Sequence, residues 1–343
     1  MRVLVAMSGG VDSSVAAALV LEAGHEVVGA TMKLWGGPSD TGCCSVSDVE
    51  DARRVAQQLG INHQVFNFSE DFERDVVRPY VDDHAAGLTP NPCIECNRHL
   101  KFDRFLERAV KLGFDAVATG HHARVERRPE GVWALRRGAD PAKDQSYVLH
   151  MLGQGQLARL LLPVGDMTKA DVRERAAVLA LRTAAKPDSQ DVCFIPRRGG
   201  RGSFLAQRID LHPGRVVDDE GRQIATVPAV ELVTVGQRKG LGSAIGHRYV
   251  TAVDPAARTV EVGPLGRLLV TAIPVGPPTW ADRAPAPDEV LEVQMSAHGR
   301  TVAGRWDHEG AVVLEEPVRR VAPGQSVVLY RGDAVVGGAV ARA

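Results

Sequence analysis

The first residues of the chain constrain its fold more than any other part of the sequence. Residues 2–7 form an apolar run that predicts a buried strand, and the Ala-rich run 13–23 predicts a helix. A polar segment with two glycines, residues 8–13, lies where the strand gives way to the helix. Glycines let the backbone approach an anion closely, and the unpaired N–H groups of a first helical turn point toward it. The pattern therefore predicts a phosphate-binding turn.

The spacing of this turn differs from the Walker pattern, which has four residues between its glycines and a following Lys. The run SGGVDS, from Ser8 to Ser13, instead resembles the pyrophosphate loop of ATP pyrophosphatases. Those enzymes bind ATP and release pyrophosphate, leaving AMP on an oxygen of the substrate. The alternative is a turn without a ligand, but Asp12 and two Ser flanking the glycines of an apolar segment argue against it.

The first half of the chain alternates between strands and helices, which is typical of a parallel sheet covered on both faces. The expected strands are 2–7, 26–32, 61–68 and 115–119. The expected helices are 13–23, 48–59 (capped by Asp48), 70–86, 97–112, 154–161 and 168–180. Ligands of such sheets bind beyond the carboxyl ends of the strands. The 8–13 turn, Met32, Gly120 and His121 are expected to meet there.

The pattern changes after residue 197, where residues 197–202 suggest a flexible basic linker. Short β-rich runs follow at 215–217, 249–253, 259–262 and 268–272, then a proline-rich linker at 274–287 and several short strands up to 343. We therefore expect an α/β fold, with a parallel-sheet, adenine-nucleotide-hydrolase-like domain at 1–198. A central β-rich domain at 199–275 and a small C-terminal β-barrel at 284–343 should follow.

Composition and charge indicate where the protein is found and what it can bind. No apolar run approaches the roughly 18 to 20 residues that span a bilayer, and no signal-peptide pattern is present. We expect a cytoplasmic protein without membrane contacts. The net charge of −1 gives no overall attraction for nucleic acid, so RNA binding would need local patches. Residues 196–250 offer one, with nine Lys or Arg against five acids.

The five Cys do not suggest structural disulfides in that compartment. They comprise the adjacent Cys43 and Cys44, a C-x-x-C formed by Cys93 and Cys96, and Cys193. The C-x-x-C allows three interpretations: half of a zinc site that no second pair completes, a redox dithiol, or two ligands of an iron–sulfur cluster. Cys96 is expected just before a helix, where the helix dipole favours its thiolate.

Six motifs in the same order resemble those of bacterial tRNA-specific 2-thiouridylases, which thiolate the wobble uridine of certain tRNAs. They are SGGVDS at 8–13, TPNPCIECN at 89–97, ATGH at 118–121, KDQSY at 143–147, DS with CF within 188–194, and GQRKGLG at 236–242. The similarity covers nearly the whole chain, and six motifs in order argue against coincidence.

The resemblance implies ATP-dependent 2-thiolation, in which uridine O2 is adenylated and then replaced by sulfur, giving 2-thiouridine, AMP and pyrophosphate. Cys193 would carry a persulfide delivered by a sulfur-donor protein. Cys96 would attack C2, or reduce the persulfide and close a transient Cys96–Cys193 disulfide. Asp12 would act in catalysis by holding Mg²⁺, although it can also serve only as a helix cap.

The resemblance also implies the contact residues. Those for ATP are Ala6, Met7, Ser8, Gly9, Gly10, Val11, Asp12, Ser13, Met32 and Gly120. Those for the target base are Asn91, Pro92 and Cys93, and those for the rest of the tRNA are Lys143, Asp144 and Gln145.

The chain departs from the family at Cys93, where many members have an Asp with an acid/base role that does not carry over. Cys93, Cys96 and Cys193 suggest an alternative, a 4Fe–4S cluster whose open iron passes sulfide to the activated base. Two further alternatives are another pyrophosphate-loop ligase and a tRNA-binding sulfur carrier without catalysis. An Arg–aromatic pair of some relatives is replaced near Ser296-Ala297-His298, so that tRNA contact is not implied here.

Overall fold

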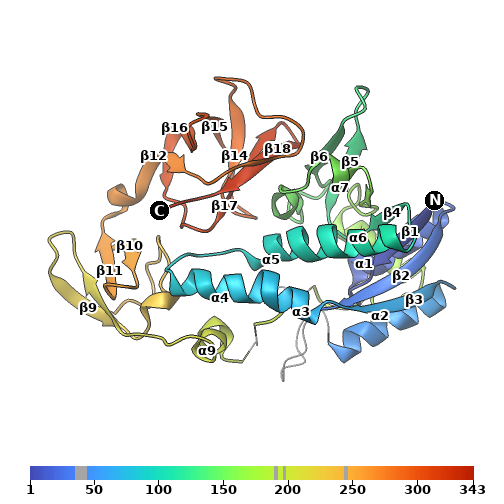
Figure 1. The fold of residues 1–343 in the computed structure, drawn as a ribbon, viewed down its shortest axis with the longest axis horizontal. Helices are drawn as coiled ribbons and strands as arrows, with labels where there is room; N and C mark the ends of the chain where they lie inside the picture. The colour runs from blue at the N-terminus through green and yellow to red at the C-terminus, as the bar shows by residue number, and fades with distance from the viewer. Residues whose placement is uncertain (35–44, 189–191, 196–197, 243–245) are drawn as a thin grey trace.

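The computed structural model describes residues 1–34, 45–188, 192–195, 198–242 and 246–343 (Figure 1). Within these ranges, no helix is long and apolar enough to cross a bilayer.

The N-terminal part is built on a parallel sheet whose described strands run in the spatial order β3–β2–β1–β4–β7. The strands are β1 (Arg2–Ala6), β2 (Glu26–Lys33), β3 (Asn62–Asn67), β4 (Ala116–Ala118) and β7 (Leu160–Leu161). Strand order reverses between β1 and β4. At such a switch point the two connecting segments diverge, which opens a crevice beyond the carboxyl ends of the strands.

The prediction of a helix over 154–161 is wrong in its second half. Helix α7 covers only Gln154–Leu157; after a two-residue turn comes β7, in which Leu160 pairs with Val117 of β4. A short run of Leu fits a helix or a buried strand equally well by its pattern. The edge of β4, distant in sequence, decides in favour of the strand.

Helix α1 (Val11–Glu22) and helix α2 (Val46–Gln58) follow β1 and β2, and α8 (Lys169–Val178) follows β7. Thr168 caps α8 as predicted, in a reciprocal arrangement with Asp171. The predicted cap Asp48 is wrong, because α2 begins earlier and Ser45 Oγ accepts the Asp48 N–H at 3.1 Å. The Asp48 carboxylate is thereby left to other partners.

Two long helices lie side by side beneath the C-terminal sheet (Figure 1). The first comprises α3 (Ser69–Phe72), a π-helical segment (Glu73–Val77) and α4 (Arg78–Ala85). The second comprises α5 (Pro92–Glu95), a π-helical segment (Cys96–Arg104) and α6 (Phe105–Lys111). We call the second one the connecting helix.

The connecting helix begins five residues before the predicted start at residue 97, which corrects the placement of Cys96. Asn91 is the N-cap, its Oδ1 accepting the Cys93 N–H at 3.1 Å, and Pro92 occupies the first position. Proline is tolerated there because that N–H has no helical partner. Cys93 therefore lies in the first turn, and Cys96 lies inside the helix, beyond the strongest effect of the dipole.

The central part contains helix α9 (Gly200–Ala206) and a mixed sheet in the order β10–β11–β8–β9. The strands are β8 (Gly214–Val217), β9 (Gln223–Val227), β10 (Tyr249–Asp254) and β11 (Thr259–Gly263). The expected strands at 215–217, 249–253 and 259–262 are confirmed, while β9 was not predicted. The expected flexible linker is wrong over 200–202, because these residues begin α9, whose Phe204 and Leu205 are buried.

The C-terminal sheet follows the order β12–β16–β15–β14–β17–β18–β6–β5, with β13 also paired to β18. Its C-terminal strands are β12 (Leu269–Pro274), β13 (Thr279–Trp280), β14 (Leu291–Gln294), β15 (Val302–Trp306), β16 (Ala311–Arg319), β17 (Ser326–Arg331) and β18 (Ala334–Val340). The hairpin of β5 (Ala123–Arg127) and β6 (Trp133–Arg137) comes from the N-terminal part and joins this sheet at β18 (Figure 1). Sequence reasoning did not foresee this hairpin.

The N-terminal parallel sheet and the C-terminal strands share one hydrophobic core. Leu4, Val117 and Tyr147 belong to the same buried cluster as Val328 and Tyr330. The predicted fold class is confirmed by the arrangement of the sheets: an α/β domain on a parallel sheet, a β-rich centre and a C-terminal β-rich domain. The boundaries 1–198, 199–275 and 284–343 stay predictions, and β12, which precedes residue 275, pairs with β16 of the C-terminal sheet.

Candidate active site

A cavity of about 650 Å³ lies where β1, β2 and β4 end. Its walls come from the 8–13 turn, the 119–122 and 142–145 segments, Lys169, and the 186–188 segment. The exposed His298, which follows β14, also lines it. The cavity therefore occupies the crevice expected from the strand order.

Two glycines allow the backbone to close around this cavity. Gly9 has a φ of +72°, and a Cβ there would lie 2.3 Å from the Asp48 carbonyl oxygen. A Cβ on Gly120 would lie 2.6 Å from the Ser13 backbone nitrogen. Gly10 caps α1 without a side-chain hydrogen bond to the helix N–H groups. The start of α1 thus faces the cavity with N–H groups suited to an anion.

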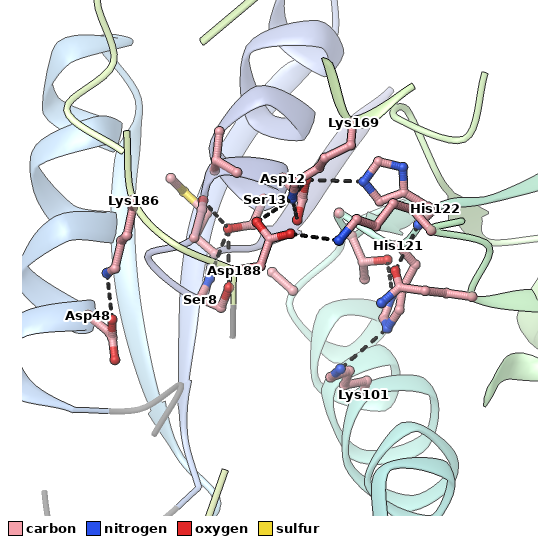
Figure 2. A pocket seen from close by; sticks show the side chains of 18 of the residues that line it. Ser8, Asp12, Ser13, Asp48, Lys101, His121, His122, Lys169, Lys186 and Asp188 are labelled. Carbon is pink, nitrogen blue, oxygen red and sulfur yellow. Dashed lines mark hydrogen bonds and ion pairs between the residues drawn. The ribbon is translucent and has the colours of Figure 1, made fainter. Parts of the chain in front are cut away.

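Asp12 lies between two basic side chains, as Figure 2 shows. Lys169 Nζ donates to both Asp12 carboxylate oxygens at 2.7 and 2.8 Å, and His122 Nε2 lies 3.1 Å from Oδ1. Burial favours a higher pKa for Asp12, but the hydrogen bonds from His122 and Lys169 outweigh it and hold the pKa below its ordinary value. Asp12 is therefore ionised at neutral pH.

Asp188 is the second carboxylate that Lys169 contacts, at 3.0 Å. It also accepts from Lys143 at 2.9 Å and Arg173 at 2.7 Å. Burial opposes ionisation, but the hydrogen bonds from Lys143 and Lys169 bring the pKa of Asp188 to about 2. Asp12 and Asp188 thus offer the hard oxygen ligands that Mg²⁺ prefers, with Lys169 between them.

Lys186 binds the 8–13 turn on the side that faces α2 (Figure 2). Its Nζ donates to the Gly9 carbonyl oxygen at 2.9 Å, to Asp48 at 2.6 Å and to Asp51 at 2.7 Å. Burial would lower the Lys186 pKa, but the hydrogen bonds to Asp48 and Asp51 outweigh it and raise the pKa. One cation therefore holds together the turn, the start of α2 and the 186–188 segment.

His121 is a neutral side chain at the edge of the cavity. Burial, followed by the nearby charge of Lys101, lowers the His121 pKa well below its ordinary value. Its Nε2 lies 3.4 Å from Lys101 Nζ, and its Nδ1 lies 2.7 Å from Thr119 Oγ1. Because an ammonium group only donates, Nε2 accepts from Lys101 and Nδ1 carries the proton toward Thr119.

The thiols lie in a different setting, which we call the thiol region: Cys96, Cys193 and the apolar side chains that pack around them. Cys96 is buried in a cluster that includes Phe72, Tyr80 and Phe194, and the half-buried Cys193 packs against the same cluster. The ring centre of Phe194 lies 5.6 Å from the ring centre of Phe72 and 5.3 Å from that of Tyr80. The residues that line the cavity include neither thiol.

The iron–sulfur alternative finds no support in this geometry. Among the described residues, no group of three or more His, Cys, Asp or Glu side chains is placed to hold a metal ion. Cys93 is exposed, whereas Cys96 is buried. Cys43 and Cys44 fall outside the described residues, so no role is assigned to them.

The structure brings most of the expected nucleotide contacts together. Those that line the cavity are Ala6, Met7, Ser8, Gly10, Val11, Asp12, Ser13, Met32 and Gly120. Gly9 lies behind them against Asp48. Lys143, Asp144 and Gln145, expected to contact tRNA, line the same cavity, whereas Asn91, Pro92 and Cys93 do not. The ligands assigned to these residues stay predictions.

Sequence reasoning missed Lys169, Lys186 and His298 as members of the cavity wall. One signal for Lys169 was available: it is the first residue of α8, where a positive side chain opposes the helix dipole. A cation at such a position needs a compensating anion, and Asp12 and Asp188 supply it.

Comparison with known protein families finds one match in the N-terminal part of the chain and one in the C-terminal part. Residues 1–197 match the family described as "tRNA methyl transferase HUP domain". Residues 270–341 match the family described as "Aminomethyltransferase beta-barrel domain".

Three relatives that match nearly the whole chain share one name. Proteins named "tRNA-specific 2-thiouridylase MnmA" from Chloroflexus aurantiacus and Chloroflexus aggregans are 47% and 48% identical, each over 98% of this chain and 97% of its own length. One from Acidothermus cellulolyticus is 47% identical over 99% of this chain and 97% of its own length.

Proposed function

The chain belongs to the family of tRNA-specific 2-thiouridylases, and we propose that it uses ATP to replace O2 of the wobble uridine of tRNA by sulfur. The observation that carries the proposal is the cavity at the 8–13 turn. Open N–H groups at the start of α1, Lys143, Lys169 and two carboxylates meet there. A phosphate chain and its metal ion require that combination.

The nucleotide half of the reaction takes place in the cavity. The phosphates of ATP lie against the start of α1, and the uridine O2 attacks the α-phosphorus while pyrophosphate leaves. Asp12 and Asp188 would hold Mg²⁺, which neutralises phosphate charge when it is bound. Lys169, which contacts both carboxylates, would face the phosphates from the same cavity wall. A fixed cation at that point stabilises the charge that develops as pyrophosphate departs.

The sulfur half takes place in the thiol region. A sulfur-donor protein leaves a persulfide on Cys193, and the Cys96 thiolate attacks the sulfur bonded to Cys193 Cβ. This closes the Cys96–Cys193 disulfide and releases hydrosulfide, which adds to uridine C2 as AMP leaves. An external thiol then reduces the disulfide. The packing of both residues against one apolar cluster supports this pairing.

The connecting helix links the sites of the nucleotide step and of the sulfur step. It carries Cys96 in the thiol region and Lys101 in the cavity wall. Cys96 and Lys101 are five residues apart in a π-helical segment, which corresponds to about one helical turn. Asn91, Pro92 and Cys93, the residues expected to contact the target base, lie at the start of this helix, just before Cys96.

The test is a reconstitution with purified protein, unmodified tRNA, ATP, Mg²⁺ and a persulfide source. We expect 2-thiouridine in digested tRNA by mass spectrometry, with one pyrophosphate released per thiolation. Asp12→Ala should abolish both products; unchanged turnover would remove the 8–13 turn from the mechanism. Activity that tracks bound iron and requires Cys93 would replace the persulfide route by the cluster. ATP consumption with an amino acid instead of tRNA would favour the ligase alternative.

Binding of tRNA provides a second test. If the basic side chains of residues 196–250 contact phosphates, the affinity for tRNA should fall steeply as salt rises. An affinity that does not change with salt would exclude them as the RNA surface. Tight binding without any pyrophosphate release would favour the carrier alternative.

A further inference from the structure

Arg137 joins the wall of the nucleotide cavity to the C-terminal sheet. It is the last residue of β6, in the hairpin that the N-terminal part contributes to that sheet. Its Nη1 donates to Asp144 Oδ2 at 3.1 Å and to Gln294 Oε1 at 2.8 Å. Its guanidinium also lies over the ring of Tyr330, 3.7 Å from the ring centre. One side chain thus contacts a cavity residue and two residues of the C-terminal strands.

Asp144 is the anchor of the cavity wall on this side. The buried carboxylate accepts from the N–H groups of Gly138 and Ser146, both at 3.0 Å, and from Ser146 Oγ at 2.8 Å. The residues on either side of it reach into the site. Lys143 pairs with Asp188, and Gln145 Oε1 accepts the N–H of His122 at 2.9 Å. A shift of Asp144 would therefore move two contacts of the cavity.

The partners on the C-terminal side are held in place as well. Gln294 is buried, and its Nε2 donates to the carbonyl oxygens of Ser296 at 2.9 Å and Ala297 at 3.2 Å. These bonds turn its Oε1 toward Arg137 and fix the segment that carries His298 into the cavity wall. Tyr330 is fully buried, and its hydroxyl lies 3.2 Å from Ser146 Oγ.

We propose that Arg137 is a positioning residue through which the C-terminal sheet sets the shape of the nucleotide cavity. A planar guanidinium can bond two acceptors and stack on a ring at once, which fixes all three relative to one another. The Asp144 wall and the His298 segment then keep their places only while the C-terminal sheet is docked. The inference rests on the proposed function, because it takes ATP as the occupant of the cavity.

The neighbouring Arg136 supplies a matched control. It lies on the same strand and also crosses to the C-terminal strands, through an ion pair with Asp333. Its other partner is Glu126 of the hairpin itself. Because side chains alternate along a strand, it points away from Asp144, and neither Arg136 nor its ion-pair partners Asp333 and Glu126 are among the described residues that line the cavity. Its loss should weaken the docking of the hairpin without disturbing the nucleotide.

The experiment compares full-length Arg137→Met, Arg137→Lys, Gln294→Met and Arg136→Met. ATP affinity is measured by calorimetry, kcat and KM for ATP by pyrophosphate release with tRNA, and Tm by thermal unfolding. We expect Arg137→Met to weaken ATP binding about tenfold, since charge-assisted hydrogen bonds to a buried carboxylate and amide are lost. Arg137→Lys should recover little of this, because an ammonium lacks the planar fork.

Gln294→Met should weaken ATP binding about threefold from outside the cavity, and Arg136→Met should lower Tm while leaving ATP affinity unchanged. Equal ATP affinities in Arg137→Met and Arg136→Met would overturn the inference. If Arg137→Met does not fold, an unchanged ATP affinity in Gln294→Met overturns it alone. Calorimetry keeps this test separate from the proposed function: a wild-type protein that binds ATP but releases no pyrophosphate with tRNA contradicts only the latter.

Discussion

The nucleotide cavity and the thiol region are held together by opposite kinds of interaction. Around the cavity, Lys169 and Lys186 each bridge two carboxylates, and these charges fix the backbone of the 8–13 turn. Around the thiols, aromatic rings such as Phe72 and Phe194 pack edge to face, and apolar side chains dominate the cluster. Phosphate chemistry needs charges that are already in place, whereas a persulfide needs protection from water and stray thiols.

The contrast teaches that the two halves of the reaction should be separable. In the proposed function, the cavity should bind and activate ATP without the thiols, and Cys193 should accept sulfur without a nucleotide. The two regions adjoin: Leu34 lines the cavity and belongs to the apolar cluster of Cys96, and the connecting helix carries both Cys96 and Lys101. Substitutions confined to one region should therefore leave the chemistry of the other intact.

The largest expected effect comes from the thiols. Cys193→Ser should lower formation of 2-thiouridine at least about a thousandfold, because no sulfur can be carried. Release of pyrophosphate in a single turnover with tRNA should change by less than about threefold, because the cavity is untouched. Parallel assays of thiouridine and pyrophosphate measure the two steps. Equal loss of both would show that the regions act as one unit.

The next effect is the converse change in the cavity. Asp12→Asn removes a charge that Lys169 and His122 contact, and we expect release of pyrophosphate to fall about a hundredfold. Loading of Cys193 with labelled sulfur from a persulfide donor should match the wild type. A variant that loses sulfur loading as well would contradict the separation.

A smaller effect is expected from the close backbone contact at Gly120. In Gly120→Ala the new methyl group would lie 2.6 Å from Ser13 N and 2.7 Å from Asp12 C, so the turn must shift. We expect a loss of about 1 to 3 kcal/mol in the free energy of unfolding and weaker ATP binding. Gly155→Ala is the matched control, because nothing lies within 4 Å of its Cβ position. Urea unfolding of both variants should show a loss only at Gly120.

The smallest expected effect is on the stability of the folded protein at low pH. The folded pKa of Asp188 is about 2, below its ordinary 3.8, and that of Asp12 is also lowered. The contribution of Asp188 to stability is therefore complete above about pH 4 and lost as pH falls toward 2, and that of Asp12 is likewise lost in acid. With screening it is about 1 kcal/mol for Asp188. Unfolding of Asp188→Asn between pH 5 and 2 should show a shallower loss than wild type, whereas Cys96→Ala should keep the wild-type slope.

The sequence correctly predicted the helices, strands and turns that depend on residues close together in the chain. The strand, turn and helix of residues 2–22 follow from apolar periodicity and two glycines, and Thr168 with Asp171 marks the start of α8. The start of the connecting helix was misjudged because Pro90 and Pro92 together read as a break. Only the Asn91 cap shows that Pro92 is already the first helical residue.

Long-range pairing decided the rest of the fold. Residues 160–161 became a strand because β4 had an edge to pair with, and the β5–β6 hairpin left its own domain to extend the C-terminal sheet at Ala334. Neither outcome can be read from a short window, because the partner lies tens to hundreds of residues away. Strand pairing depends on which edges remain open after the core has packed.

The sequence by itself determined the family, because its motifs follow the order of those of the 2-thiouridylases, and it predicted a glycine turn for phosphates and thiols for sulfur. The tertiary structure decided which charges serve the turn. Lys169 reaches Asp12 across 157 residues, Lys186 reaches Gly9 across 177, and His298 reaches the cavity from the C-terminal sheet. A charged side chain is accepted in a partly buried site only where a partner compensates its lost hydration, and the fold alone brings that partner near.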